Sequence, residues 1–176
     1  PLMVGDGDAL ALLPAPVSVA SEDYLLARRL YLYVPPGVSG IAKEFVDFAL
    51  SESGQAVVER VGFVDLIPEC DTRAASCQGC RERHRRLVWG ACRLSTSFRL
   101  DPRTGDFDTR AVRDFGRAAK VVAHPPFVNR QVILLGFADD PAGEYASVGA
   151  SRVLAERVAT QLRARGVAVS AVAGLG

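Results

Sequence analysis

Hydrophobic and polar residues follow two different periods in the second half of the chain. Residues 132–135 are all apolar, and the run is too short for a helix, so it predicts a buried strand that ends at Gly136. From 148 to 162 apolar residues recur at helical spacing, which predicts an amphipathic helix stopped by Gly166. The residues expected on its inward face are Val148, Val153, Leu154, Ala155, Val158, Ala159 and Leu162.

Further elements are predicted on both sides of this strand and helix. Residues 94–100 alternate in polarity, as in a half-buried strand, and residues 103–106 form a turn. Asp108 is expected to cap a helix that ends before Pro125 and Pro126, and residues 167–172 predict another strand. The order β-α-β-α-β predicts a small layered α/β (α+β) domain. The inward residues of the capped helix are Ala111, Phe115, Ala119 and Val122.

The first third of the chain has its own pattern. Residues 30–34 alternate and predict a strand, whereas the spacing of apolar residues from Ile41 to Ala49 predicts an amphipathic helix. Ser51 is expected to cap a second helix, with its burial running through Val57, Val58 and Val61.

Composition places the chain among ordinary globular proteins. Of its 176 residues 49% are hydrophobic and 23% are charged, and we find no internal repeat. The net charge of +1 gives no overall attraction to nucleic acid or anionic membrane, and no apolar run approaches the ~18 residues of a membrane span. Arginines concentrate between 73 and 93 without a recognisable nucleic-acid motif, so we interpret them as a solvated linker face and expect no nucleic-acid partner.

The segment from Gly136 to Ala155 resembles the OmpA C-terminal-like domain, which holds cell-envelope proteins onto peptidoglycan. The family pattern Gly-His-Thr-Asp reads Gly136-Phe137-Ala138-Asp139 here. The helix pattern Asn-x-x-Leu-Ser-x-x-Arg-Ala corresponds to Ser147, Ala150-Ser151 and Leu154-Ala155. The resemblance implies a site in which the Asp binds the ammonium of diaminopimelate and the Arg binds its carboxylate. The candidate peptidoglycan-binding residues are Asp139, Ser147, Ser151 and Arg157.

One position departs from that pattern, because Leu154 stands in the arginine slot. Arg152 lies roughly 200° around the helix, whereas Arg157 keeps the same face one turn farther from the mouth of the site. We therefore expect peptidoglycan binding to be weak or lapsed. The alternative is that the domain serves as a protein-interaction or bracing module. Residues 174–176 fall where the family has a glycine-bearing turn before its last strand. That last strand is missing from this sequence, which predicts an exposed sheet edge.

Residues 1–68 resemble the C-terminal part of the second lobe of a phosphate-type periplasmic solute-binding protein, the kind that serves ABC transporters. The segments that carry this resemblance are 26–34, 45–51 and 54–59. It implies that phosphate or another small anion is bound by parts of the lobe outside this sequence. The chain starts at a proline and shows no signal peptide, so we expect a piece of a longer precursor.

All four cysteines lie in an Arg-rich linker expected at 69–92, ahead of the OmpA-like domain at 93–176. In an oxidising periplasm, which both resemblances imply, Cys70, Cys77, Cys80 and Cys92 are disulfide candidates whose connectivity stays open. The alternative is a zinc site that uses Cys77, Cys80 and His84 with Cys70 or Cys92.

Catalytic groups are poorly placed in the sequence. Arginines near His84 should lower its proton affinity, and spacing places no acidic residue to orient its ring. The adjacent Asp139 and Asp140 are typical of a turn. We therefore predict a non-catalytic periplasmic cell-envelope protein without a cofactor, and we rank a zinc or redox protein last.

Overall fold

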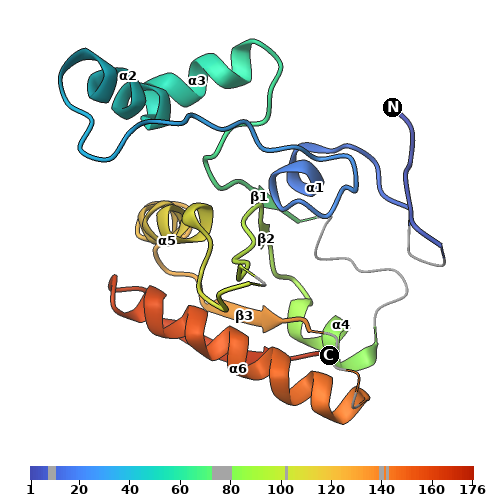
Figure 1. Ribbon diagram of the computed structural model, residues 1–176. Helices are drawn as coiled ribbons and strands as arrows, with labels where there is room; N and C mark the ends of the chain where they lie inside the picture. The colour runs from blue at the N-terminus through green and yellow to red at the C-terminus, as the bar shows by residue number, and fades with distance from the viewer. Residues whose placement is uncertain (8–10, 73–80, 102, 139–140, 142) are drawn as a thin grey trace. The chain divides into compact units, whose positions relative to one another are not determined.

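The computed structural model describes residues 1–7, 11–72, 81–101, 103–138, 141 and 143–176 (Figure 1). This described part has six helices and four short strands in two small sheets, which confirms a mixed α/β fold. The chain divides into two compact units. The first comprises residues 1–71 with 94–97, and the second comprises residues 72–93 with 98–176.

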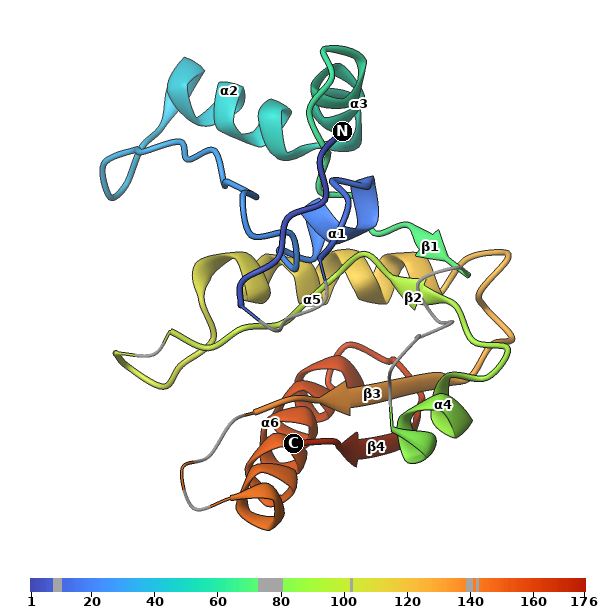
Figure 2. The same ribbon diagram turned by 90° about the vertical axis from the view of Figure 1, so that its right-hand side faces the viewer.

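A β-α-β arrangement lies at the centre of the second unit. Strand β3 (Val132–Gly136) pairs in parallel with β4 (Val169–Gly174), and the connection between them contains the long helix α6 (Glu144–Arg163). Figure 2 shows the two strands side by side and pointing the same way. The predicted strand, helix and second strand are confirmed. The turn that the resemblance implies at 174–176 is wrong at its first residue, because Gly174 is the last residue of β4.

Glycines on both strands let α6 pack directly on the sheet backbone. A Cβ atom at Gly136 would lie 2.7 Å from the carbonyl carbon of Ser151, and one at Gly174 would lie 2.6 Å from the Ser151 Oγ. Ser151 itself is fully buried. The inward face predicted for α6 was wrong at Val153, which is 62% exposed, because this close approach places small side chains against the strands instead.

Helix α6 ends as its sequence predicts. Gly166 adopts a left-handed φ of 83°, and the Val167 amide donates to the carbonyl of Leu162 at 3.1 Å. This bond occupies a carbonyl that the end of the helix leaves without an intrahelical partner, and it turns the chain back toward β4.

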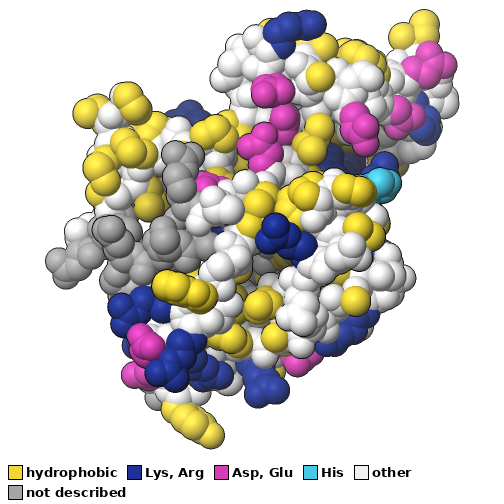
Figure 3. Space-filling model, turned by 180° about the vertical axis from the view of Figure 1, so that it is seen from behind, with side chains coloured by type: hydrophobic (Ala, Val, Ile, Leu, Met, Phe, Trp, Pro, Cys, Tyr) yellow, Lys and Arg dark blue, Asp and Glu magenta, His cyan; other side chains and the backbone are white. Residues whose placement is uncertain are grey.

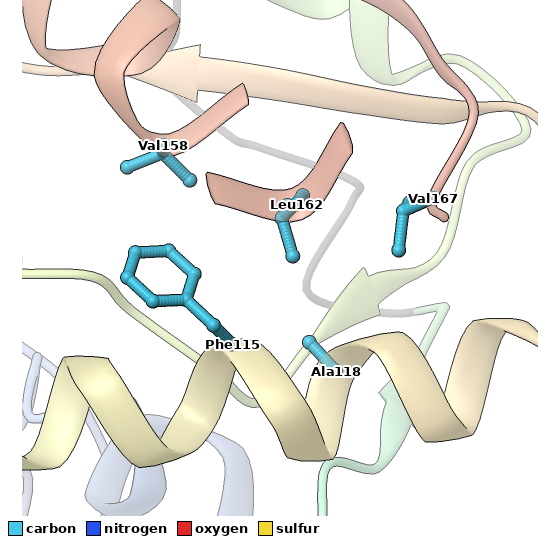
Figure 4. Close-up of a cluster of buried hydrophobic side chains, with 5 residues drawn as sticks. All are labelled: Phe115, Ala118, Val158, Leu162 and Val167. Carbon is cyan, nitrogen blue, oxygen red and sulfur yellow. The ribbon is translucent and has the colours of Figure 1, made fainter. Parts of the chain in front are cut away.

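The hydrophobic core forms between α6 and helix α5 (Thr109–Val122) (Figure 4). The Asp108 carboxylate accepts a hydrogen bond from the Ala111 amide at 2.6 Å, which confirms the predicted N-cap. Phe115 is buried, with its ring centroid 4.6 Å from that of Phe98 in a stacked pair and 5.0 Å from that of Phe107 in a T-shaped pair. The buried cluster consists of Phe115, Ala118, Val158, Leu162 and Val167.

The strand predicted at 94–100 is largely wrong. Only β2 (Arg93–Leu94) forms there, and it pairs with β1 (Cys70–Asp71), not with β3 or β4. The Ser95 amide donates to the carbonyl of Glu69 at 2.8 Å, and Leu100 makes one isolated bridge to Phe107 across the predicted turn. The alternation instead reflects packing of single side chains, such as Phe98 on Phe115.

The first unit contains helices α1 (Pro16–Ala20), α2 (Gly40–Leu50) and α3 (Glu52–Arg60). The two predicted helices and the Ser51 cap are confirmed, since Ser51 Oγ accepts from the Gly54 amide at 3.2 Å. The predicted burial of α3 was wrong. Val57 and Val61 are exposed and Val58 is only half-buried. Gln55 is buried instead, because its side chain donates to the Ala49 carbonyl and accepts from the Leu66 amide, each at 2.7 Å.

The strand predicted at 30–34 does not form. The apolar side chains of this segment are exposed, with Leu30 at 78% and Tyr33 at 90%, and the rings of Tyr31 and Tyr33 stack on each other. None of the described strands includes this segment, so its alternating residues have no sheet to join.

Exposed apolar side chains are frequent on the face shown in Figure 3.

The contact of α6 with the strand glycines predicts a large loss of stability for Gly136→Ala. The added methyl group would overlap the backbone of Ser151, so the helix must move away from the sheet. We expect the free energy of unfolding to fall by about 3 kcal/mol. Urea unfolding followed by circular dichroism measures this change.

Gly149→Ala is the matched control, because Gly149 lies within α6 and a methyl group added there would meet nothing within 4 Å. There the substitution should raise stability by about 1 kcal/mol through helix propensity. A similar loss in both variants would contradict the packing argument.

Candidate functional site

The site implied by the OmpA resemblance lies where β3 ends and α6 begins. Phe137 follows β3 and is 57% exposed, and Gly143, with a φ of 101°, is the N-cap residue of α6. Asp139, the principal candidate, lies outside the described residues, as do Cys77 and Cys80. The described part of the site therefore consists of its rim and the first turns of α6.

The two candidate serines are buried and bonded within the fold. Ser147 Oγ donates to the carbonyl of Gly143 at 3.1 Å. Ser151 Oγ donates to the carbonyl of Val148 at 3.0 Å and accepts from the Gly176 amide at 3.2 Å. Both side chains face the strands, so their role in the described structure is to satisfy backbone groups and keep α6 close to the sheet.

Arg157 lies against the turn at 103–107 and not at the mouth of the site. Its guanidinium donates to the carbonyl of Gly105 at 3.0 Å and lies 5.2 Å from the ring centroid of Phe107. A cation over an aromatic face is attracted by the ring's negative charge density. Leu154, in the family's arginine slot, is half-buried. Neither position presents a guanidinium next to Gly143.

A short helix, α4 (Glu82–Val88), supplies the other described part of the rim. Arg81 forms an ion pair with Glu144 in the first turn of α6, and the ring of His84 lies 5.6 Å from that of Phe137. We predicted only a linker here. The missed signal was the spacing of Glu82 with Arg85 and Arg86, which pair with it at 2.8 Å as i+3 and i+4 neighbours on a helix.

His84 is the one described group of this rim with a resolved electrostatic shift. Partial burial of the ring, and then the positive charge of Arg93, lower its pKa below the ordinary 6.5. The predicted direction is confirmed, although burial contributes more than the arginine. The neutral form of the imidazole is therefore favoured where the ring lies beside Phe137.

A disulfide joins Cys70 to Cys92, beside the β1–β2 pair. This bond settles the partner of Cys70 and of Cys92, which the sequence had left open. Neither sulfur is then a thiolate that could bind zinc in the alternative site. Among the described residues no group of three or more His, Cys, Asp or Glu side chains is arranged to hold a metal ion. In the same part of the chain, no helix is both long and apolar enough to cross a membrane.

Comparisons with protein-family models, with curated proteins and with solved structures find no match for this chain. The two family resemblances therefore rest on the sequence motifs alone.

The disulfide predicts a stability loss in the double variant Cys70→Ser and Cys92→Ser. Removing the cross-link enlarges the conformational freedom of the unfolded chain, so the free energy of unfolding should fall by about 3 kcal/mol. Urea unfolding measures the loss. Peptide mapping without reductant should show Cys70 and Cys92 in one linked fragment of the unchanged protein, and fragments that pair either residue elsewhere would contradict the assignment.

The environment of His84 predicts a pH dependence of stability. Because its pKa is lower in the folded chain, the unfolded chain binds the proton first as pH falls below about 6.5, and stability should decrease there. Arg93→Gln should raise the pKa of His84 in an NMR titration, since it removes one positive charge. An unchanged or lower pKa in that variant would contradict the assigned contribution of Arg93.

Proposed function

We propose that this chain belongs to a non-catalytic protein of the bacterial cell envelope. In this proposal residues 1–68 are the end of a phosphate-type solute-binding lobe, and residues 93–176 form an OmpA-like module that couples the lobe to the cell wall. The main support for a periplasmic location is the Cys70–Cys92 disulfide, because such bonds persist in oxidising compartments such as the periplasm.

The parallel β3–α6–β4 arrangement supports the OmpA-like assignment of the second unit. It has the strand, crossover helix and strand that the motif-bearing segment predicts, and the motif glycine Gly136 lies at the strand end next to Ser151. In the first unit, α2, α3 and the Ser51 cap agree with the two helices expected for the end of a solute-binding lobe. Phosphate or a similar anion would be the solute of the complete lobe.

The described contacts favour weak binding to peptidoglycan. Ser147 and Ser151 are buried, and Arg157 is engaged by Gly105 and Phe107, so the carboxylate of diaminopimelate would meet no guanidinium from α6. Loss of a desolvated bidentate pair costs roughly 2 to 5 kcal/mol in binding. Asp139 is then the principal ligand group left for the wall.

The engagement of Arg157 also favours a second candidate function. A module whose helix arginine braces its own turn at Gly105 can act through packing alone, as an interaction or bracing domain. In that case the envelope location holds while wall binding is absent.

Sedimentation with purified peptidoglycan sacculi distinguishes the two candidates. We expect weak co-sedimentation of the unchanged chain, loss of it in Asp139→Ala, and stronger binding in Leu154→Arg, which restores the family arginine. Leu154→Gln is the matched control, because it adds polarity at the same half-buried position without a cation.

The thermal midpoint of each variant verifies that folding is retained. If neither the unchanged chain nor Leu154→Arg binds sacculi, wall anchoring is excluded and the bracing function stands. Equal gains from Leu154→Arg and Leu154→Gln would contradict a carboxylate-binding role for the restored arginine.

A further inference from the structure

A groove of about 610 Å³ lies between α4 and β4 in the second unit. Its helix side is formed by Glu82, Arg83, Arg86 and Leu87, and its strand side is formed by residues 171–173. It is distinct from the strand-end site, because none of the described peptidoglycan candidates, Ser147, Ser151 and Arg157, lines it. The strand side is apolar and the helix side is basic, so its two walls would recognise different parts of one ligand.

The groove follows the edge of β4. Successive strand residues point to opposite faces of a sheet, so a hollow over one face would be lined by alternate residues. Ala171, Val172 and Ala173 are consecutive, and all three line this groove. The edge of β4 that faces away from β3 pairs with none of the other described strands.

The backbone of Val172 is directed toward that edge. The Leu175 amide donates to the carbonyl of Gly136 at 3.0 Å, which directs the backbone groups of residue 175 toward β3. Backbone groups alternate in direction along a strand, so those of Ala173 also face β3 and those of Val172 face away. An added strand would therefore find a donor and an acceptor at Val172.

The sequence of β4 leaves this edge without the usual protection against pairing. Natural edge strands carry charged residues or prolines that block association, whereas β4 reads Val-Ser-Ala-Val-Ala-Gly. A smooth, uncharged edge inside a preformed groove is suited to β-strand addition.

The charge of α4 selects the kind of peptide. The helix contains three arginines and one glutamate, and the carboxylate of Glu82 is already paired with Arg85 and Arg86. Arg83 has no ion pair among the described residues, although it lines the groove. The surplus of positive charge beside the strand edge complements carboxylates.

We propose that this groove binds an extended acidic peptide segment, which adds to β4 as a third strand and places its carboxylates near Arg83 and Arg86. Apolar side chains of the same segment would lie on the alanines of β4 and on Leu87. This activity is independent of peptidoglycan binding.

The test uses fluorescence anisotropy of the full chain with two labelled hexapeptides, one alternating glutamate with valine and the other alternating lysine with valine. We expect the acidic peptide to bind and the basic peptide not to bind. Arg83→Glu should weaken binding about fivefold, because it reverses a charge at the groove. Arg113→Glu is the matched control, since it makes the same charge reversal at an exposed position of α5 that does not line the groove.

Amide hydrogen exchange supplies a readout of the strand pairing itself. The acidic peptide should slow exchange of the Val172 amide about tenfold and leave the Ala173 amide, which faces β3, unchanged. The proposal is overturned if neither peptide binds, if both bind equally, or if Arg113→Glu weakens binding as much as Arg83→Glu. Protection of Val172 that rises with protein concentration, without peptide, would assign this edge to a second copy of the chain and also overturn it.

Discussion

The close packing of α6 on the backbones of β3 and β4 is the constraint on which the second unit depends. Only glycine at positions 136 and 174 leaves room for the helix, whose serine and alanine side chains fill the remaining space. Packing at this density tolerates little added volume. The contact fixes the axis of α6, and with it the position of its first turn relative to the end of β3.

That constraint also determines how the polar residues of α6 are used. A helix held this close to a sheet must satisfy buried hydroxyl groups internally, and Ser147 and Ser151 do so through backbone carbonyls and the Gly176 amide. On the flank of the helix, Arg157 braces the turn at Gly105 over the ring of Phe107. Among the ligands that the family resemblance implies, Ser147, Ser151 and Arg157 therefore contribute to the architecture of the unit.

In the described structure, charged and aromatic side chains that a ligand could reach lie around α4. This helix brings His84 to Phe137, pairs Arg81 with Glu144, and places Arg83 along the edge of β4. A basic helix beside an uncharged strand edge is suited to recognition of peptide, whereas the buried serines of α6 present little to a sugar polymer. Together the two proposals describe an envelope protein with a weak wall contact and a peptide-binding groove.

The sequence by itself determined the elements whose reasons are local. The Asp108 and Ser51 caps, the left-handed Gly166, the apolar strand at 132–135 and the helical spacing that follows it all depend on groups within a few residues of one another. Such interactions form wherever the segment is placed. The β-α-β order of the second unit followed from them.

Only the tertiary structure decided which segments pair as strands, which cysteines are linked and which polar side chains are buried. Alternation at 30–34 and 94–100 did not produce the predicted strands, because a strand needs a partner that its own sequence does not specify. The pairing of Cys70 with Cys92, the burial of serines in place of Val153, and the engagement of Arg157 each depend on segments distant in sequence. Long-range contacts therefore decided the chemistry of the candidate site, because they determine which polar groups are buried and which face solvent.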